Sequence, residues 1–175
     1  MFISYYESVL GRILLASDEL GITGLLFENQ KYYAAGLTDT IEEETEVIVR
    51  AKQWLNEYFE GKIPTTVVPL HPIGTPFQLE VWNILLTIPY GTTMTYNDIA
   101  HQIANNRGIE RMSAQAVGGA VGHNKLSLLI PCHRVVGTNG SLTGYAGGVE
   151  RKRSLLQLEH GYQDSFYVPR KGSAL

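Results

Sequence analysis

The sequence predicts an α+β protein with a small N-terminal antiparallel β-sheet plus helix domain, then a C-terminal winged helix-turn-helix-like domain. Three observations support this class. Short β-rich runs separated by turn residues open the chain, whereas helices with clear N-terminal signals fill its second half. The formal charge also changes sign, from −6 over residues 1–75 to +3 over residues 76–175. With 175 residues, the chain can form one ordinary domain or two small ones.

The N-terminal part combines three predicted strands with one amphipathic helix. We expect strands at residues 2–7, 12–16 and 22–27, separated by Gly11 and by the turn at residues 18–21. Apolar residues then recur at helical spacing from Val47 to Phe59, after a run of acids and before Gly61. This domain should cover residues 1–69, and the proline- and glycine-containing stretch 70–75 should be a linker.

The C-terminal part, residues 76–175, begins with a strong helix signal. Thr75 can cap a helix that starts at Pro76, and Gln78 completes a capping box, so we expect a helix to about residue 87. Thr95 and Ser113 should cap two further helices, 96–104 and 114–122, which together suggest a helix-turn-helix. We expect a strand at 126–130, a turn at 131–136, a glycine-rich wing at 137–148, a last helix at 150–160 and a C-terminal tail.

Composition narrows the functional classes. The chain is 44% hydrophobic and 18% charged, as in soluble globular proteins. It has neither an apolar run of about 18 residues nor a secretory signal, so we expect a cytoplasmic protein with no membrane partner. A single cysteine excludes a disulfide framework and a zinc site with two thiolates, and we expect no metal and no cofactor. Only the basic half has the sign of charge that attracts phosphate.

Cys132 is the one thiol, and two interpretations of it compete. Most free cysteines are buried and serve as small hydrophobic residues. However, Pro131 ends the preceding apolar run and forces a turn that can present the sulfur. His133 and Arg134 supply neighbouring groups that favour a thiolate over the usual thiol, whose pKa is about 8.5. These neighbours favour a working nucleophile.

The segments Ala116–Ala120, Asn124, Pro131–Val135 and Gly144–Gly148 together resemble the active-site half of the O6-methylguanine-DNA alkyltransferases. Pro-Cys-His-Arg-Val is a fairly specific pentapeptide, and here an asparagine precedes the cysteine by eight residues and a glutamate follows it by 27. The resemblance is strong over residues 76–161. It is weak before them, although the strands at 11–16 and 21–27 suit the family's N-terminal domain.

The resemblance implies a transfer site. Cys132 corresponds to the alkyl acceptor, and His133, Glu159 and a bound water correspond to the relay that takes its proton. Tyr96 corresponds to the phenol that donates to N3 of guanine, and Asn124 to the hinge that ties the recognition helix to the active-site turn. The residues that would surround the base are Val135, Tyr145 and Ala146. Because a thioether has no activated carbonyl, the alkylated product should be permanent and each chain should react once.

The same resemblance implies binding of double-stranded DNA that contains O6-alkylguanine, by a monomer. The helix 114–122 is rich in glycine, which costs up to about 1 kcal/mol per residue. Either it packs tightly against another backbone, or it must be thin enough to enter the minor groove, about 6 Å wide. The candidate DNA contacts are Gln115, Ala116, Gly118, Gly119, Arg107, Arg111, Lys125, Arg134 and Arg151, the last as part of the basic cluster 151–153.

Two departures from the family pattern stand out. Gln115 occupies the place of an arginine that commonly fills the gap left by the flipped nucleotide, and Lys125 replaces a proline after the hinge asparagine. Some relatives hold zinc in the N-terminal domain, but no cysteine is present there.

Other interpretations remain open at this stage. Taken singly, His133, Glu159, Tyr96 and Tyr145 suit ordinary surface or core roles. A damage sensor that flips the base without repairing it would lack the acceptor cysteine. A winged helix-turn-helix transcription factor would leave Pro131–Val135 and Glu159 unexplained, and a thiol hydrolase would turn over repeatedly.

Overall fold

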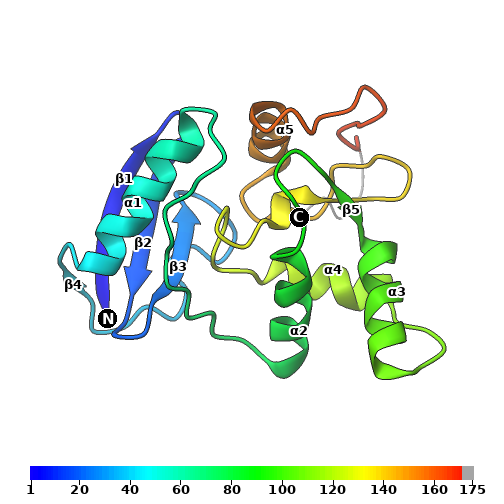
Figure 1. Ribbon diagram of the computed structural model, residues 1–175, viewed down its shortest axis with the longest axis horizontal. Coiled ribbons are helices and arrows are strands. Elements are labelled where there is room, and N and C mark those ends of the chain that lie inside the picture. Colours follow the sequence, from blue (N-terminus) through cyan, green and yellow to red (C-terminus); the bar gives the residue numbers. More distant parts are fainter. Residues whose placement is uncertain (171–175) are drawn as a thin grey trace. The chain divides into compact units, whose positions relative to one another are not determined.

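The structure, a computed structural model, describes residues 1–170 and divides into two compact units (Figure 1). The first unit contains Met1–Ile73 and Lys125–Ser127, and the second contains Gly74–Asn124 and the chain from Leu128 onward. The α+β class is confirmed. The expected limits 1–69, 70–75 and 76–175 stay a prediction, and residues 171–175 of the expected tail lie outside the described residues.

The first unit is built on a four-stranded sheet in the order β3-β2-β1-β4. Strands β1 (Phe2–Ser8), β2 (Gly11–Ser17) and β3 (Ile22–Phe27) form the antiparallel meander, and the short β4 (Ile41–Glu42) adds in parallel to β1. All of β3 and the stretch of β2 from Ile13 onward are buried. The three meander strands therefore match the sequence prediction, whereas β4 was not foreseen because two residues carry no periodic signal.

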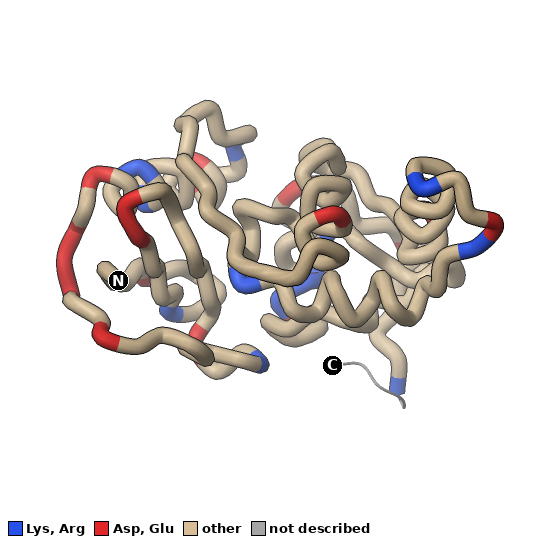
Figure 2. The backbone as a smooth tube through the Cα atoms, turned by 90° about the horizontal axis from the view of Figure 1, so that it is seen from below, with Lys and Arg blue, Asp and Glu red and all other residues tan. Residues whose placement is uncertain are grey.

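Helix α1 (Glu46–Phe59) packs against this sheet through Ile48, Ala51, Leu55 and Tyr58. Thr45 caps its start, and Glu60 is its C-cap residue, followed by Gly61. Acidic residues are spread around this unit (Figure 2), in keeping with its negative formal charge.

Three helices form the framework of the second unit. They are α2 (Pro76–Leu85), α3 (Tyr96–Arg107) and α4 (Ala114–Gly122), and α4 contacts both of the others (Figure 1). The capping box of α2 is present as predicted, and Thr95 forms a second one on α3. The indole Nε1 of Trp82 donates to Ala120 O at 2.9 Å, so a side chain of α2 holds the backbone of α4.

A pair of two-residue strands joins α3 to the cysteine turn. Strand β5 (Met94–Thr95) runs parallel to β6 (Val135–Val136), and β6 follows directly on the 3-10 turn Cys132–Arg134. Tyr96, the first residue of α3, is thereby held beside the segment that carries Cys132. Helix α5 (Val149–Leu158) completes the unit and contacts the 3-10 turn.

The expected strand at residues 126–130 was wrong. Leu126 forms only an isolated parallel bridge with Leu25. The backbone of Leu25 donates to Lys125 O at 2.8 Å and accepts from Ser127 N at 3.0 Å. Leu128 then takes a left-handed conformation, φ 69°, which breaks the extended run. The run is apolar because it is buried, not because it belongs to a strand.

Candidate active site

The reactive turn is fixed from two sides. Pro131 precedes the 3-10 turn, in which Cys132 N donates to Ile130 O at 2.8 Å. The side-chain amide of Asn124 donates to the same carbonyl at 2.9 Å, while Asn124 N donates to Val121 O at the end of α4. Cys132 is only 4% exposed. Asn124 thus joins the end of α4 to the turn that carries the sulfur.

Next to the sulfur lies a buried charged cluster. Nε2 of His133 is 2.7 Å from Glu159 Oε1, and both side chains are fully buried. Arg134 donates to both oxygens of Glu159, at 2.8 and 2.9 Å, and to Ile88 O at 2.7 Å. Gly91 N approaches the same carboxylate at 3.4 Å. The carboxylate of Glu159 therefore orients the imidazole and holds the guanidinium at once.

The loop before α3 needs a glycine to make this approach. Gly91 has φ 77°, and a Cβ on it would lie 2.9 Å from Glu159 O. A side chain at this position would collide with backbone and strain the loop.

Burial contributes to the pKa shift of each titratable group in this cluster. It raises the pKa of the Cys132 thiol above its usual value, although Asn124 and the charge of Lys152 oppose the shift. Burial likewise lowers the pKa of His133, and the hydrogen bond to Glu159 offsets this only in part. For Glu159, burial would raise the pKa, but His133 and Arg134 outweigh it and hold the pKa well below the usual range. The resting site therefore holds a thiol, a neutral imidazole and a carboxylate.

Tyr96 faces the wing that runs from β6 to α5. Its hydroxyl donates to Thr143 O at 2.8 Å, and burial raises its pKa. Gly144 has φ 85°, and a Cβ there would lie 2.3 Å from the Tyr96 hydroxyl oxygen, so only glycine allows this contact. Of the residues expected around the base, Val135 and Tyr145 are buried and Ala146 is half-buried.

Helix α4 has one buried face and one exposed face. Val117, Ala120 and Val121 are buried, whereas Gln115, Ala116 and Gly119 are exposed. A Cβ added to Gly118 would lie 3.8 Å from the Tyr96 ring, an ordinary contact, and a Cβ on Gly119 would meet nothing within 4 Å. Tight packing therefore does not account for the glycine at 119.

The predicted cationic DNA contacts are placed very differently from one another. Arg111 is exposed, and Arg107 is exposed and paired with Glu80. Arg151 is half-buried and donates to Gly147 O at 3.0 Å. Lys125 belongs to the first unit, where its Nζ donates to Ala35 O at 3.3 Å.

Two expectations about basic residues need correction. Arg134 was expected to contact DNA, but it is 8% exposed and its guanidinium is committed to Glu159 and Ile88 O. Lys152 was expected on a basic helix face with Arg151 and Arg153, yet it is fully buried. It shares one face of α5 with Leu155, Leu156 and Glu159, so its place in the apolar stripe was the signal that sequence reasoning missed.

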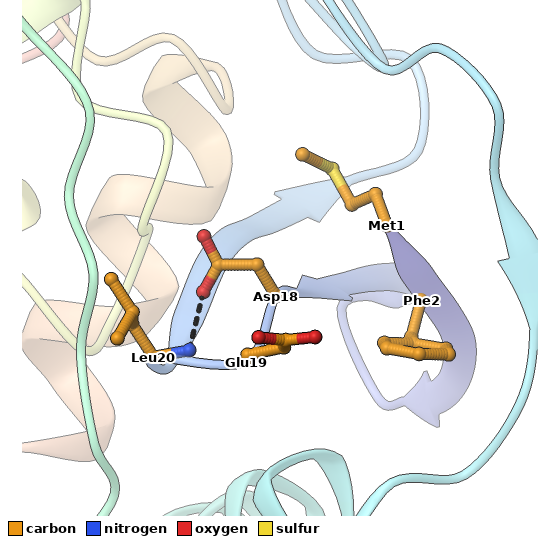
Figure 3. A pocket seen from close by; sticks show the side chains of 5 residues that line it. All are labelled: Met1, Phe2, Asp18, Glu19 and Leu20. Carbon is orange, nitrogen blue, oxygen red and sulfur yellow. Dashed lines mark hydrogen bonds between the residues drawn. The ribbon is translucent and has the colours of Figure 1, made fainter.

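Two hollows are lined by residues outside this cluster. In the first unit, Met1, Phe2, Asp18, Glu19 and Leu20 line a hollow of about 450 Å³, in which Asp18 accepts from Leu20 N at 2.9 Å (Figure 3). In the second unit, a hollow of about 510 Å³ lies between α3 and the start of α4. Neither includes Cys132.

Among residues 1–170 no group of three His, Cys, Asp or Glu side chains is arranged to hold a metal ion, and no helix is long and apolar enough to cross a membrane.

Comparison with known proteins matches the chain in both parts. The profile described as 6-O-methylguanine DNA methyltransferase, DNA binding domain, matches residues 76–161, and that of the ribonuclease-like domain matches residues 1–72. A methylated-DNA–protein-cysteine methyltransferase of Methanosarcina acetivorans is 42% identical over 91% of this chain and 98% of its own length. The protein of the same name from Haemophilus influenzae is 40% identical over 91% of this chain and 86% of its own.

Solved structures agree with the sequence comparisons. The crystal structure of Mycobacterium tuberculosis OGT in complex with DNA has a TM-score of 0.81 and 39% identity, covering 91% of this chain and 93% of that one. An O6-methylguanine DNA methyltransferase from Methanococcus jannaschii has a TM-score of 0.60 and 26% identity, covering 94% of this chain and 97% of that one.

The contrast between Arg134 and Arg151 is directly testable. Arg134→Met should lower the free energy of unfolding by about 3–5 kcal/mol, because it leaves the buried Glu159 carboxylate without its main cation. Arg151→Met should change stability little and weaken DNA binding, because it removes a half-buried cation near the surface. Urea unfolding and fluorescence anisotropy with duplex DNA measure the two effects. A stable Arg134→Met protein that has lost only DNA affinity would restore Arg134 as a DNA contact.

Proposed function

Since the chain belongs to the 6-O-methylguanine DNA methyltransferase family, we propose that it repairs DNA by moving the alkyl group of O6-alkylguanine onto Sγ of Cys132. The observation that carries the assignment to this residue is the buried arrangement of Cys132, His133 and Glu159. The reaction is a single transfer from the base to the protein, and it ends in a thioether. Each chain therefore repairs one lesion.

The nucleophile needs a base because burial keeps the resting thiol protonated. His133 takes the thiol proton, directly or through water, while Glu159 fixes the orientation of the ring through Nε2. The sulfur then forms a bond to the alkyl carbon as the bond from that carbon to O6 breaks. The electron pair of the broken bond goes to the guanine.

The leaving guanine must be neutralised as it departs. Tyr96 is the donor we assign to this step, because it begins α3 directly after β5, and β5 pairs with the strand that follows the cysteine turn. At rest the Tyr96 hydroxyl donates to Thr143 O. A carbonyl can only accept a hydrogen bond, so the phenol keeps its proton and can donate it to a bound guanine instead. The guanine itself is received by Val135, Tyr145 and Ala146.

DNA recognition is assigned to the exposed face of α4, which consists of Gln115, Ala116 and Gly119. Glycine inside a helix lowers the stability of the helix. At Gly119 close packing does not explain the glycine, because an added Cβ would meet no atom within 4 Å. A helix that is thin on its exposed side suits the minor groove. Because Cys132 is 4% exposed, the target base must leave the duplex stack before it can react.

We propose that the chain acts as a monomer on double-stranded DNA, that Arg107, Arg111 and Arg151 contact phosphates, and that the protein is cytoplasmic. The alternative of a damage sensor without transfer is disfavoured by Cys132, since a sensor has no use for a thiol beside a positioned imidazole.

Transfer to Cys132 predicts a defined product. Mixing the protein with duplex DNA that contains O6-methylguanine should add one methyl group per chain, on Cys132, because the thioether offers no route of release. Intact-protein mass spectrometry followed by peptide mapping measures this. Cys132→Ser should bind the same DNA and gain no mass. Repeated turnover, or methylation of another residue, would refute the assignment.

Gly119→Ala should move stability and DNA binding in opposite directions. The added methyl should raise the free energy of unfolding by up to about 1 kcal/mol, because alanine favours the helix and meets no neighbour. It should also weaken binding to duplex DNA, because it thickens the face assigned to the minor groove. Reaction with free O6-benzylguanine serves as the control and should not change. Unaltered duplex affinity would remove Gly119 from the interface.

Gln115→Ala should slow repair of duplex DNA while leaving reaction with free O6-benzylguanine nearly unchanged. The exposed glutamine can fill part of the gap left by the extruded base and bond to the orphaned pyrimidine, and the free base needs no extrusion. Single-turnover rates with both substrates measure the difference. Gln115→Arg should tighten duplex binding and steepen its salt dependence. Equal slowing of both substrates by Gln115→Ala would show a role in the fold or in the reacting pocket instead.

A further inference from the structure

The chain continues past α5 into a segment that the transfer scheme above does not use. Residues 163–168, which we call the C-terminal strap, lie beyond residue 161, where the match to the DNA binding domain profile ends. They return to the wing between β6 and α5, and of the six only Phe166 is buried. Segments near a chain end are ordered only where contacts tie them down, and here the contacts are specific.

The strap pairs with the wing through its backbone. Tyr167 N donates to Gly140 O at 3.0 Å, and Leu142 N donates to Tyr167 O at 3.0 Å. These two bonds form a parallel bridge between Ser141 and Tyr167. The side-chain amide of Asn139 also donates to the Tyr167 hydroxyl, at 2.8 Å. Tyr167 is thus bonded to the wing on both sides of the bridge, although it is 43% exposed.

Phe166 fixes the strap from the inside. It belongs to a buried cluster with Val136 of β6, Leu142 of the wing and Leu156 of α5. The Tyr162 ring meets the Phe166 ring edge-on, with the two ring centres 5.8 Å apart. One aromatic side chain therefore joins the strap both to the wing and to the strand that follows the cysteine turn.

The close approach of strap and wing depends on a glycine. Gly140 has φ 86°, and a Cβ on it would lie 2.6 Å from Ser165 O. At that distance a side chain would collide with the backbone of the strap, so only glycine allows the two segments to lie together at this point. The sequence of the wing is thus matched to a segment that lies beyond α5.

The wing residue that the strap holds comes directly before the transfer site. Leu142 is fully buried, and the next residue, Thr143, accepts a hydrogen bond from the Tyr96 hydroxyl at 2.8 Å. Tyr145 and Ala146, which we assign to the base, follow in the same loop. The backbone position of Leu142 therefore helps to set the position of the carbonyl that holds Tyr96 and of the residues assigned to the base.

We propose that the C-terminal strap positions the wing for transfer, with Phe166 as its anchor and Tyr167 as the residue that aligns the wing backbone. This inference rests on the proposed function. Both residues are positioning residues, because neither is assigned to the base, the sulfur or DNA. A loop that is ordered before the base arrives loses less conformational entropy on binding, and small misplacements of reacting groups lower rates strongly.

Tyr167→Pro tests the backbone contact without altering the wing, because proline has no N–H to donate to Gly140 O. Val168→Pro is the matched control, since Val168 N donates to no acceptor within residues 1–170. Tyr167→Pro should slow the single-turnover reaction with free O6-benzylguanine at least about tenfold, because a misplacement of about 1 Å can cost more than that. Val168→Pro should react at the rate of the unchanged protein. Affinity for unmodified duplex DNA, measured by fluorescence anisotropy, should stay the same in both variants because the exposed face of α4 is unaltered.

Gly140→Ala tests the same contact from the side of the wing. The added methyl would collide with Ser165 O, so the strap must move away from the wing. Gly61→Ala is its control, because Gly61 has a similar φ, 78°, and a Cβ there would meet nothing within 4 Å. Gly140→Ala should slow the reaction with O6-benzylguanine as Tyr167→Pro does, whereas Gly61→Ala should not.

Hydrogen exchange separates positioning from stability. In Tyr167→Pro the amides of residues 139–146 should exchange faster than in Val168→Pro, while those of α4 keep their protection. Faster exchange of the wing with an unchanged rate toward O6-benzylguanine would overturn the proposal, because the strap would then only stabilise the wing. Faster exchange throughout the second unit would also overturn it, because lost stability would then explain the slower reaction.

The same measurements distinguish this inference from the proposed function. If the unchanged protein transfers nothing to Cys132 from O6-benzylguanine or from methylated duplex DNA, the proposed function is refuted, and the positioning role that rests on it is refuted as well. If the unchanged protein transfers the alkyl group and Tyr167→Pro does so equally fast, the proposed function stands and the role of the strap is refuted.

Discussion

The buried carboxylate of Glu159 is the interaction on which the second unit depends. It accepts two hydrogen bonds from Arg134 and lies 2.7 Å from Nε2 of His133. Through Arg134 it also connects to Ile88 O, and through Gly91 N to the loop before β5. One side chain at the end of α5 thus fixes the reactive turn and the segment between α2 and α3. A carboxylate is stable at this depth only because its partners are complete.

This arrangement also sets the chemistry of the turn. Because Arg134 neutralises Glu159, the carboxylate orients His133 without giving it a full counter-charge, and burial keeps the ring neutral. A neutral imidazole can accept a proton, which suits a base beside a thiol whose pKa is raised.

The sequence predicted well those features whose signals are local. The start of α2 followed from Thr75 and Gln78, and the meander followed from turn residues between short apolar runs. The prediction from sequence failed where contacts between distant segments of the chain determine the local structure. The apolar run 126–130 is buried without becoming a strand, and β5 pairs with β6 across about forty residues. Arg134 was expected at the surface because its burial depends on the distant Glu159 and Ile88, whereas for Lys152 the apolar stripe of α5 was a local signal that the prediction did not use.

Helix α4 shows how one element meets two opposed demands. Its inner face is held by Val117, Ala120 and Val121, and Trp82 bonds to its backbone. That support allows the outer face to give up side-chain bulk at Gly119 without unfolding the helix. Gly118 lies between the two faces, beside the Tyr96 ring. The helix assigned to the DNA groove therefore lies against the residue assigned to the leaving base, so recognition and chemistry are placed on neighbouring elements.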